Sequence, residues 1–382
     1  MCFFHQLVLT AGGKRMKLNK KLVLLIFTVF IALMITACGG GNEEEEGASE
    51  DTTTKEQVVN LPNGDIISTM DPAMATDEYS FQFLSSTMEG LYRLGENAEI
   101  TEGIAINHDV SDDGLTWTFH LREDAVWSNG DPVTAHDFVF SWQRTIDPET
   151  ASEYGPYMMS GVIKNAKEIS EGEMEPSELG VTAEDDYTLV VQLENPAPYF
   201  ESLTTFGTFY PLNQKFVEEK GNEFATNSDN LLANGPFILT DWESTSHSWN
   251  LEKNTNYWDK DAVQLDKLTF DVLKDTQSAV DLYERGDLDR VDLSADLVDQ
   301  YRSSEEFETS GEAALTFLKF NQTGHPALQN KNIRKAISRA VDKQALVDHV
   351  LNNGSIVSNG AVPQDFVYHP ETDEDFRDIN GD

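Results

Sequence analysis

The chain contains 382 residues, and its 67 acidic residues against 27 basic ones give a formal net charge of −40. This length allows two or more domains around a large buried core. Binding to nucleic-acid phosphates requires clustered Lys and Arg side chains, so the charge excludes nucleic acid as an expected partner. The two cysteines, Cys2 and Cys38, lie near the N-terminus, so we expect no disulfide, redox pair or thiolate metal site in the body of the chain.

The N-terminal residues have the order of a lipoprotein signal peptide over residues 1–37. Five Lys and Arg residues lie within residues 14–21, an apolar run covers residues 22–35, and small residues then precede Cys38. A transmembrane anchor is the alternative, but the run is shorter than the roughly 20 apolar residues that a spanning helix needs. We therefore expect lipid attachment to Cys38 and a location on the outer face of the cell membrane.

Two short segments flank the core of this signal. Met16 begins a conventional signal peptide by itself, so we expect it to be the true translation start. Residues 38–57 contain few apolar side chains and many acidic ones, which is typical of a solvated tether. The folded body of the protein is therefore expected to begin near Val58.

The segment from Gly114 to Trp142 predicts a strand, a turn and a capped helix. Apolar and polar residues alternate over residues 115–122, which is the pattern of a half-buried strand. Asn, Gly, Asp and Pro residues then predict a turn. Thr134 is expected to be the N-cap of the helix, with Asp137 three residues later as an acidic capping box.

Other elements follow from the same kinds of pattern. A strand, a loop and a helix are expected within residues 58–91, and a hairpin with an acidic turn over residues 181–193. Thr276 is expected to cap a helix that Gly286 ends. The remaining expected elements are strands at 237–242, 249–252, 265–273 and 315–320, and helices at 199–205, 214–220, 332–340 and 342–351, the last two with Ile333, Ile337, Leu346 and Val350 facing inward.

The order of these elements predicts the fold class. Short strands and helices follow one another without a regular βαβ order, which favours an α/β chain of the mixed α+β kind. No phosphate loop, nucleotide-binding glycine motif, serine elbow or zinc-binding helix occurs, so we expect no enzyme and no cofactor. His120 and His136 are isolated and Asp373–Asp382 lacks a closing Glu, so we expect solvated positions there rather than metal sites.

Six sequence motifs occur in a specific order along the chain. The longest, DGLTWTFHLREDAVWSNGDPVTAHDFVFSWQR, covers residues 113–144. The others are ASEY at Ala151, DDYTLVVQLENPAPYF at Asp185, NGPF at Asn234, NYWD at Asn256 and FNQ at Phe320. From about Asp65 to the last residue, the chain resembles the oligopeptide-binding lipoproteins of ABC peptide importers.

This resemblance implies a clamp of several lobes, as in periplasmic binding proteins. Lobe I would comprise residues 58–91 and 180–275, an extra lobe II residues 92–179, and a partial lobe III residues 276–382. Two lobes would close on a peptide by hinge motion, and the extra lobe would support the first. The extended peptide would be held through its main chain, as in strand addition, with its side chains in hydrated pockets.

The resemblance also implies which residues bind the ligand. They are, in chain order, Thr76, Asp77, Glu78, Tyr79, Tyr154 and Asn321. The backbone of the first four would pair with the peptide, the tyrosine at position 154 would line the pocket, and the asparagine would end a strand of lobe III. Each has a simpler alternative: a helix N-cap, a packing tyrosine and a turn former, respectively.

The resemblance further implies an ABC permease and its ATPase subunits as partners. Family members continue with a C-terminal portion whose aspartate pairs with the amino group of the ligand, so a chain ending at Asp382 is expected to be truncated, with an incomplete third lobe. One alternative function is a binder of the same family for a signalling peptide, a nickel chelate or an oligosaccharide. Another, of a different class, is a secreted hydrolase, which would require a nucleophile and base that we do not find.

Overall fold

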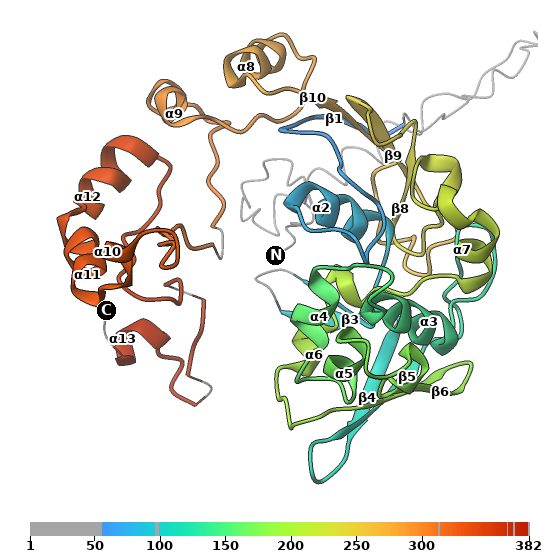
Figure 1. The fold of residues 1–382 in the computed structure, drawn as a ribbon. Coiled ribbons are helices and arrows are strands. Elements are labelled where there is room, and N and C mark those ends of the chain that lie inside the picture. The colour runs from blue at the N-terminus through green and yellow to red at the C-terminus, as the bar shows by residue number, and fades with distance from the viewer. Residues whose placement is uncertain (1–55, 96–98, 312–313, 365, 370, 381–382) are drawn as a thin grey trace, which may run out of the picture. The chain divides into compact units, whose positions relative to one another are not determined.

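The computed structural model describes residues 56–95, 99–311, 314–364, 366–369 and 371–380. The chain divides into two compact units, Met1–Val272 and Leu273–Asp382, which we describe separately (Figure 1). The expected signal peptide, the start at Met16, Cys38 and nearly all of the tether lie outside the described residues and remain predictions. Within the described ranges, no helix has the length and apolar character needed to span a membrane.

One sheet of unit 1 joins the first strand of the described chain to the last strands of the unit. Its order is β1-β10-β9-β8, with β1 parallel to β10 and the other pairs antiparallel. Helix α2 (Glu78–Thr87) packs through its fully buried Phe83, whose ring lies 5.3 Å from Trp249 and 4.9 Å from Phe270. The strands are β1 (Val58–Asn63), β8 (Phe237–Thr240), β9 (Ser248–Lys253) and β10 (Lys267–Val272).

A second sheet, fully antiparallel, has the order β4-β5-β7-β6. The expected alternation is confirmed on β5, where Trp117, Phe119 and Leu121 are buried. The strands are β4 (Ala105–Val110), β5 (Thr116–Leu121), β6 (Val181–Asp185) and β7 (Thr188–Gln192).

The expected hairpin is present as β6 and β7, but its sheet differs from the expected lobe boundary. A boundary at residue 180 would assign the hairpin to lobe I, whereas β7 pairs with β5, which belongs to the expected lobe II. The apolar face of β7 explains this, because Leu189 and Val191 are fully buried opposite Phe119 and Trp117. The boundary at residue 180 therefore cuts through one sheet.

Helix α3 (Ala135–Ile146) begins at the predicted capping box. The Asp137 carboxylate accepts a hydrogen bond of 2.8 Å from the backbone N–H of Thr134. At the other end of the helix, the Trp142 Nε1–H donates to the Phe209 carbonyl at 2.9 Å, and the two rings meet edge to face. The helix packs against β6, so the predicted strand, turn and helix form one local unit.

Short elements complete unit 1, and its two sheets share one continuous apolar core. β2 and β3 form a separate antiparallel pair. The remaining elements are β2 (Tyr92–Leu94), β3 (Ile100–Glu102), α4 (Tyr154–Met159), α5 (Ala166–Ser170), α6 (Phe200–Leu203), α7 (Gln214–Lys220) and the 3₁₀ turns at Pro176–Glu178, Gly207–Phe209, Gly221–Glu223 and Ser228–Asn230.

The described part of unit 2 consists of helices and loops. The strand expected at residues 315–320 is wrong: this segment has no regular secondary structure, and Phe317 and Leu318 are 70% and 66% exposed. A strand needs a partner strand, and the described residues of this unit provide none. The helices are α8 (Thr276–Glu284), α9 (Ala295–Tyr301), α10 (Pro326–Gln329), α11 (Lys331–Ala340), α12 (Lys343–Ala345), a π-helical turn η6 (Leu346–Leu351) and α13 (Phe376–Asn380).

The two helices expected over residues 332–351 are present, but their apolar face is not buried. Ile333, Leu346 and Val350 are exposed in the structure, and Ile337 is half-buried. The inward orientation expected for them is therefore wrong within the described unit. Helical spacing groups apolar residues on one face but does not say what covers that face.

Two further details of unit 2 differ from the sequence-based expectation. Helix α8 is capped by Asp275, whose Oδ1 accepts from the Ser278 N–H at 2.8 Å, and Thr276 is its first helical residue. Gly286, with φ of 79°, follows its end as expected. The segment from Asp373 is not wholly a solvated loop, because Asp375 is buried and α13 begins just after it.

Candidate ligand-binding site

Of the expected ligand residues at positions 76–79, Thr76 and Asp77 end the loop before α2, and Glu78 and Tyr79 are the first two residues of that helix. Thr76 and Glu78 are exposed, and Asp77 and Tyr79 are half-buried. Asp77 is the N-cap of the helix: its Oδ1 accepts from the Ser80 N–H at 2.9 Å and its Oδ2 from the Ser80 hydroxyl at 2.7 Å. The helix-cap alternative is thus realised by Asp77, and its neighbour Thr76 is exposed.

The loop is held by a buried carboxylate on its N-terminal side. Asp71 is 7% exposed and accepts hydrogen bonds from Arg144 of α3 at 2.9 and 2.6 Å. Its carbonyl oxygen also accepts from the backbone N–H groups of Met74 and Ala75, both at 3.0 Å. This turn fixes the start of the loop, and the cap at Asp77 fixes its end. No local motif marks the role of Arg144, because its partner lies 73 residues away.

The side chain of Tyr79 turns back toward β1 rather than outward. Its hydroxyl occupies the space that a Cβ would fill at Gly64, just after that strand. A larger residue at position 64 would therefore displace the tyrosine and the loop. This arrangement agrees with a site in which the loop offers its main chain to the ligand and uses its aromatic side chain for packing.

Tyr154 lies in an aromatic cluster that also includes a residue of α2. Its ring stacks on Phe206 at 5.7 Å with an interplanar angle of 21°, and meets Phe81 edge to face at 5.6 Å. Phe81 lies near the start of α2, so the structure brings Tyr154 close to the candidate loop. Tyr157, on the next turn of α4, meets the Tyr154 ring at 6.2 Å and is 82% exposed. Sequence reasoning missed Phe206 and Tyr157, although two tyrosines three residues apart were a visible signal.

The position of Tyr154 depends on a close contact at the following residue. A Cβ added to Gly155 would collide with the carbonyl oxygen of Thr145 in α3. The Gly155 N–H donates to the Ser152 hydroxyl at 3.0 Å, which fixes the first turn of α4. The glycine therefore lets α4 approach α3 closely enough for the tyrosine ring to reach α2.

Asn321 belongs to unit 2 and is described there by itself. Its Oδ1 accepts from the N–H of Thr323 at 3.1 Å, from the hydroxyl of the same residue at 2.9 Å, and from the Gly324 N–H at 2.8 Å. These contacts are those of a turn-forming asparagine. The turn-former alternative is therefore what the structure shows, and the strand expected before this residue is absent.

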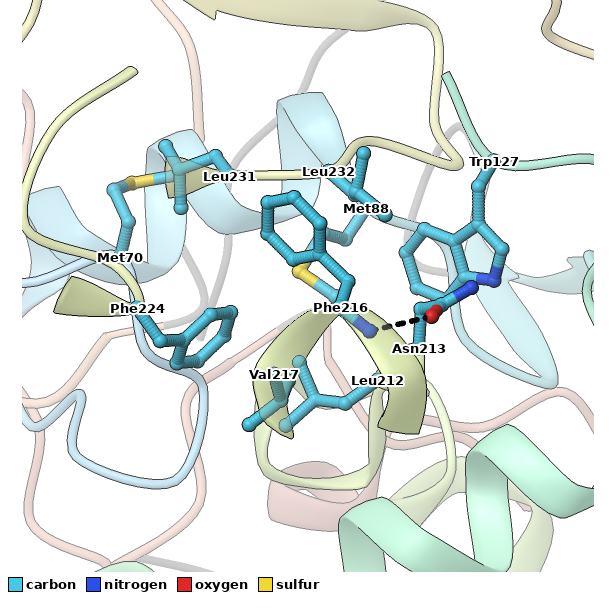
Figure 2. Close-up of a pocket in the computed structure, with 10 residues that line it drawn as sticks. All are labelled: Met70, Met88, Trp127, Leu212, Asn213, Phe216, Val217, Phe224, Leu231 and Leu232. Carbon is cyan, nitrogen blue, oxygen red and sulfur yellow. Dashed lines mark hydrogen bonds between the residues drawn. The ribbon is translucent and has the colours of Figure 1, made fainter. Parts of the chain in front are cut away.

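A small apolar pocket in unit 1 is lined by none of the expected ligand residues, and Figure 2 shows the residues that line it. Its cavity volume of about 10 Å³ is far below the roughly 300–1,000 Å³ that is usual for ligand sites. Its polar member, Asn213, already accepts from the Phe216 N–H at 2.9 Å as the N-cap of α7. The lining residues are Met70, Met88, Trp127, Leu212, Asn213, Phe216, Val217, Phe224, Leu231 and Leu232.

The histidines considered from the sequence lie at the surface beside single carboxylates. His120 Nε2 is 3.0 Å from Asp109, and His136 Nε2 is 3.4 Å from Asp186. Neither belongs to a group of three or more potential metal ligands among the described residues.

The order of motifs along the chain and its fold can now be compared with known proteins. Residues 70–380 match the model of the bacterial extracellular solute-binding proteins, family 5. The chain belongs to this family. The resemblance to oligopeptide-binding proteins is thereby confirmed, as are the mixed α/β fold class and the multi-lobe type of its structural neighbours.

Individual family members extend this comparison. The dipeptide-binding protein DppE of Bacillus subtilis is 36% identical over 327 residues, which cover 86% of this chain and 59% of DppE. Listeria monocytogenes OppA bound to peptide has a TM-score of 0.78 at 43% identity, covering 86% of this chain and 65% of that one. The pheromone receptor PrgZ has the same TM-score at 40% identity. The chain spans less than two thirds of the length of each of these relatives.

Proposed function

We propose that this protein captures oligopeptides outside the cytoplasm and delivers them to an ABC permease with its ATPase subunits. One observation carries the proposal: the aromatic cluster around Tyr154 meets α2 beside a loop that is fixed at both ends and has Met74 and Thr76 exposed. An extended peptide needs main-chain partners and aromatic surface, and this region offers both. The peptide binders among the relatives support the choice of ligand.

The ligand residues of this proposal are those expected from the sequence. The main chain of residues 76–79 would pair with the peptide, and Tyr154 would line its side-chain pocket. Asn321 is retained as a proposed contact from lobe III through its backbone, since its side chain is used within its own turn. The lobe boundaries are kept as part of the proposal, with residues 181–192 moved to the sheet of lobe II.

Peptide binding is tested on the full chain. Calorimetry with a library of peptides two to nine residues long should give saturable binding to unmodified peptides and weaker binding to peptides methylated along the main chain, because strand-like pairing needs free N–H groups. Peptides with changed side chains should bind with similar affinity. Absence of binding to the whole library would contradict the proposal.

A second ligand class is favoured by one comparison. The likeness to the pheromone receptor PrgZ supports a signalling peptide in place of a nutrient peptide. The same library separates the two, because a receptor for a signal would bind one sequence far more tightly than its scrambled version. Nickel chelates and oligosaccharides serve as further ligands in the same titration, and binding to either in place of peptides would change the proposed substrate class.

Attachment to the outer face of the membrane through Cys38 completes the proposal. Cells that express the chain and are fed an alkyne-labelled fatty acid should incorporate the label, and a Cys38→Ala variant should not. A Cys2→Ala variant is the matched control and should retain the label. Labelling that persists in the Cys38→Ala variant would exclude this anchor.

A further inference from the structure

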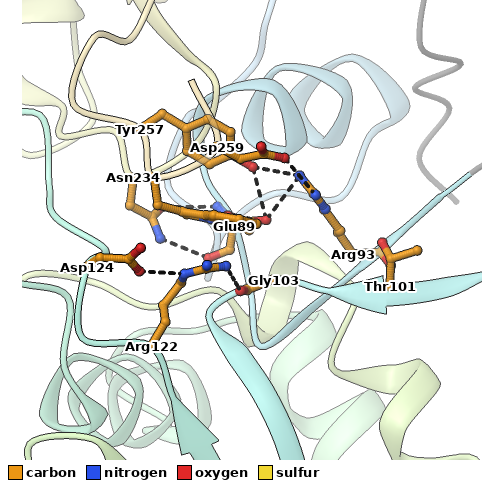
Figure 3. A network of polar contacts seen from close by, with 10 residues as sticks. Glu89, Arg93, Thr101, Gly103, Arg122, Asp124, Asn234, Tyr257 and Asp259 are labelled. Atoms are coloured by element: carbon orange, nitrogen blue, oxygen red, sulfur yellow. Dashed lines mark hydrogen bonds and ion pairs between the residues drawn. The ribbon is translucent and has the colours of Figure 1, made fainter. Parts of the chain in front are cut away.

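Glu89 is a buried carboxylic acid that the proposed ligand site does not use (Figure 3). It follows α2 directly and is 4% exposed. Asn234, 145 residues further along, fixes its backbone from both sides: its Oδ1 accepts from the Glu89 N–H at 3.0 Å and its Nδ2 donates to the Glu89 carbonyl at 2.9 Å. These two hydrogen bonds fix the backbone of Glu89, and so the starting point of its side chain, between segments that are distant in sequence.

Three side chains converge on this carboxyl group. Trp258 Nε1 donates to Oε2 at 2.6 Å, and the Tyr257 hydroxyl donates to Oε1 at 3.2 Å. The guanidinium of Arg93 lies 3.6 Å from Oε1 and donates to the Tyr257 oxygen at 2.7 Å. Its second nitrogen donates to Asp259 at 3.1 Å. Arg93 therefore contacts the buried carboxyl group and also Tyr257 and Asp259. The contacts with Tyr257 and Asp259 do not depend on the charge of Glu89.

Arg122 brings the second sheet into the cluster. It follows the last residue of β5, and its guanidinium carbon lies 3.0 Å from the centroid of the Trp258 ring. It also donates to the Gly103 carbonyl at 3.1 Å and to Asp124 at 2.8 Å. Glu89 therefore lies where the end of α2, the turn before β10 and the end of β5 meet.

Burial makes Glu89 the titrating group of this cluster. It raises the pKa of Glu89 from an ordinary 4.5 to about 7, although Arg93, Trp258, Tyr257 and Arg122 each act in the opposite direction. Burial also raises the pKa of the Tyr257 hydroxyl far above its usual value, so that hydroxyl remains a neutral donor. The two arginines keep their charges and have Asp259 and Asp124 as carboxylate partners of their own.

We propose that Glu89 is a proton switch at the junction of the two sheets of unit 1. In its ionised form the carboxylate is stabilised by the charge of Arg93 and by the hydrogen bond from the Trp258 N–H. On taking up a proton it becomes neutral, and Arg93 is then held by Tyr257 and Asp259 alone. Because α2 begins at the candidate ligand loop and ends at Thr87, two residues before Glu89, the switch lies beside the far end of the helix that follows that loop.

Fluorine NMR tests the switch directly on the full chain labelled with 5-fluorotryptophan. The Trp258 signal, assigned by its loss in a Trp258→Phe variant, should move with pH with a midpoint near 7 and should not titrate in Glu89→Gln. The matched control is Glu123→Gln, which removes an exposed carboxyl next to Arg122 and should leave the titration unchanged. A Trp258 signal that does not titrate between pH 5 and 9, or that titrates equally in Glu89→Gln, would overturn the proposal.

Unfolding equilibria give a second readout that does not depend on assigning a signal. A carboxyl whose pKa is raised in the folded state adds stability that is complete below its unfolded pKa and is lost as pH rises through the folded pKa. This group alone should therefore raise the unfolding constant by up to about tenfold per pH unit between about 4.5 and 7. Glu89→Gln should lack this rise and exceed the original chain in stability at pH 8. Lower stability of Glu89→Gln at pH 8, with a parallel pH profile, would show a static ion pair and overturn the switch.

Discussion

The Arg144 guanidinium holds the Asp71 carboxylate through two hydrogen bonds, of 2.9 and 2.6 Å. The arginine lies in the last turn of α3, and the aspartate begins the turn that leads to the candidate ligand loop. Both side chains are largely withdrawn from water, with exposed fractions of 24% and 11%. The pair therefore connects α3 to the loop that is proposed to pair with a peptide.

Replacing this arginine should weaken the fold. We expect Arg144→Met to lower the free energy of unfolding by about 2–3 kcal/mol, because it leaves the Asp71 carboxylate buried without its partner. This value is below that for a fully buried pair, because the two side chains are partly exposed to water. Urea denaturation measures the change. Lys167→Met, which breaks an exposed pair with Glu171, is the matched control and should change stability by no more than about 0.5 kcal/mol. Equal effects of the two substitutions would contradict the role of the buried pair.

Tyr154 is expected to affect both stability and ligand affinity. Tyr154→Ala should destabilise the chain by about 1–3 kcal/mol, since the ring loses its contacts with Phe206 and Phe81, and should weaken peptide binding at least about tenfold. Tyr154→Phe keeps the ring contacts and isolates the contribution of the hydroxyl. Unfolding in urea and peptide titration measure the two effects, and unchanged affinity in the folded Tyr154→Ala variant would remove this residue from the site.

Gly155 should tolerate no side chain. Gly155→Ala places a methyl group against the Thr145 carbonyl, so α4 must move away from α3 at an expected cost of about 2–4 kcal/mol. Gly311→Ala is the matched control, because a Cβ there meets nothing within 4 Å. Thermal unfolding of both variants checks this, and the prediction fails if the two melting temperatures agree.

Asp137 should also make stability depend on pH, in a range that overlaps that of Glu89. Burial raises its pKa to about 6, above the ordinary 3.8, so the stability that it contributes is complete below about pH 4 and is lost as pH rises through 6. Asp137→Asn should remove this dependence, with a difference of up to about 3 kcal/mol between pH 4 and pH 8. Urea unfolding at a series of pH values measures it. An Asp186→Asn variant, at an exposed position, is expected to keep the original pH profile.

Local features of unit 1 were predictable because their causes are adjacent in sequence. The alternation around Trp117 and Phe119 defines a strand, and the spacing of Thr134 and Asp137 defines a cap. The proposed ligand residues rest on family resemblance alone, since the main chain of residues 76–79 has no motif of its own. The network of Glu89 was not predictable, because its partner Trp258 lies 169 residues away and nothing local marks the pair.

The errors in unit 2 have a common physical cause. Apolar spacing at Ile333, Leu346 and Val350 correctly indicated helices. The spacing does not determine whether another element packs on the apolar face, and these three side chains are exposed. The apolar segment at residues 315–320 likewise has strand propensity without a strand to pair with in the described unit. Propensity gives a local preference, whereas burial and pairing require a second surface.

The parallel pairing of β1 with β10 sets an order of events during synthesis. Val58 pairs with Lys267, 209 positions later, so β1 cannot form its native pairing until most of the unit has been synthesised. At translation rates of roughly 5–20 residues per second, this interval lasts roughly 10–40 s. Throughout it, the hydrogen-bonding groups of β1 are open to strands of other chains. During synthesis, β1 is therefore open to misassociation with other chains until β10 has been made.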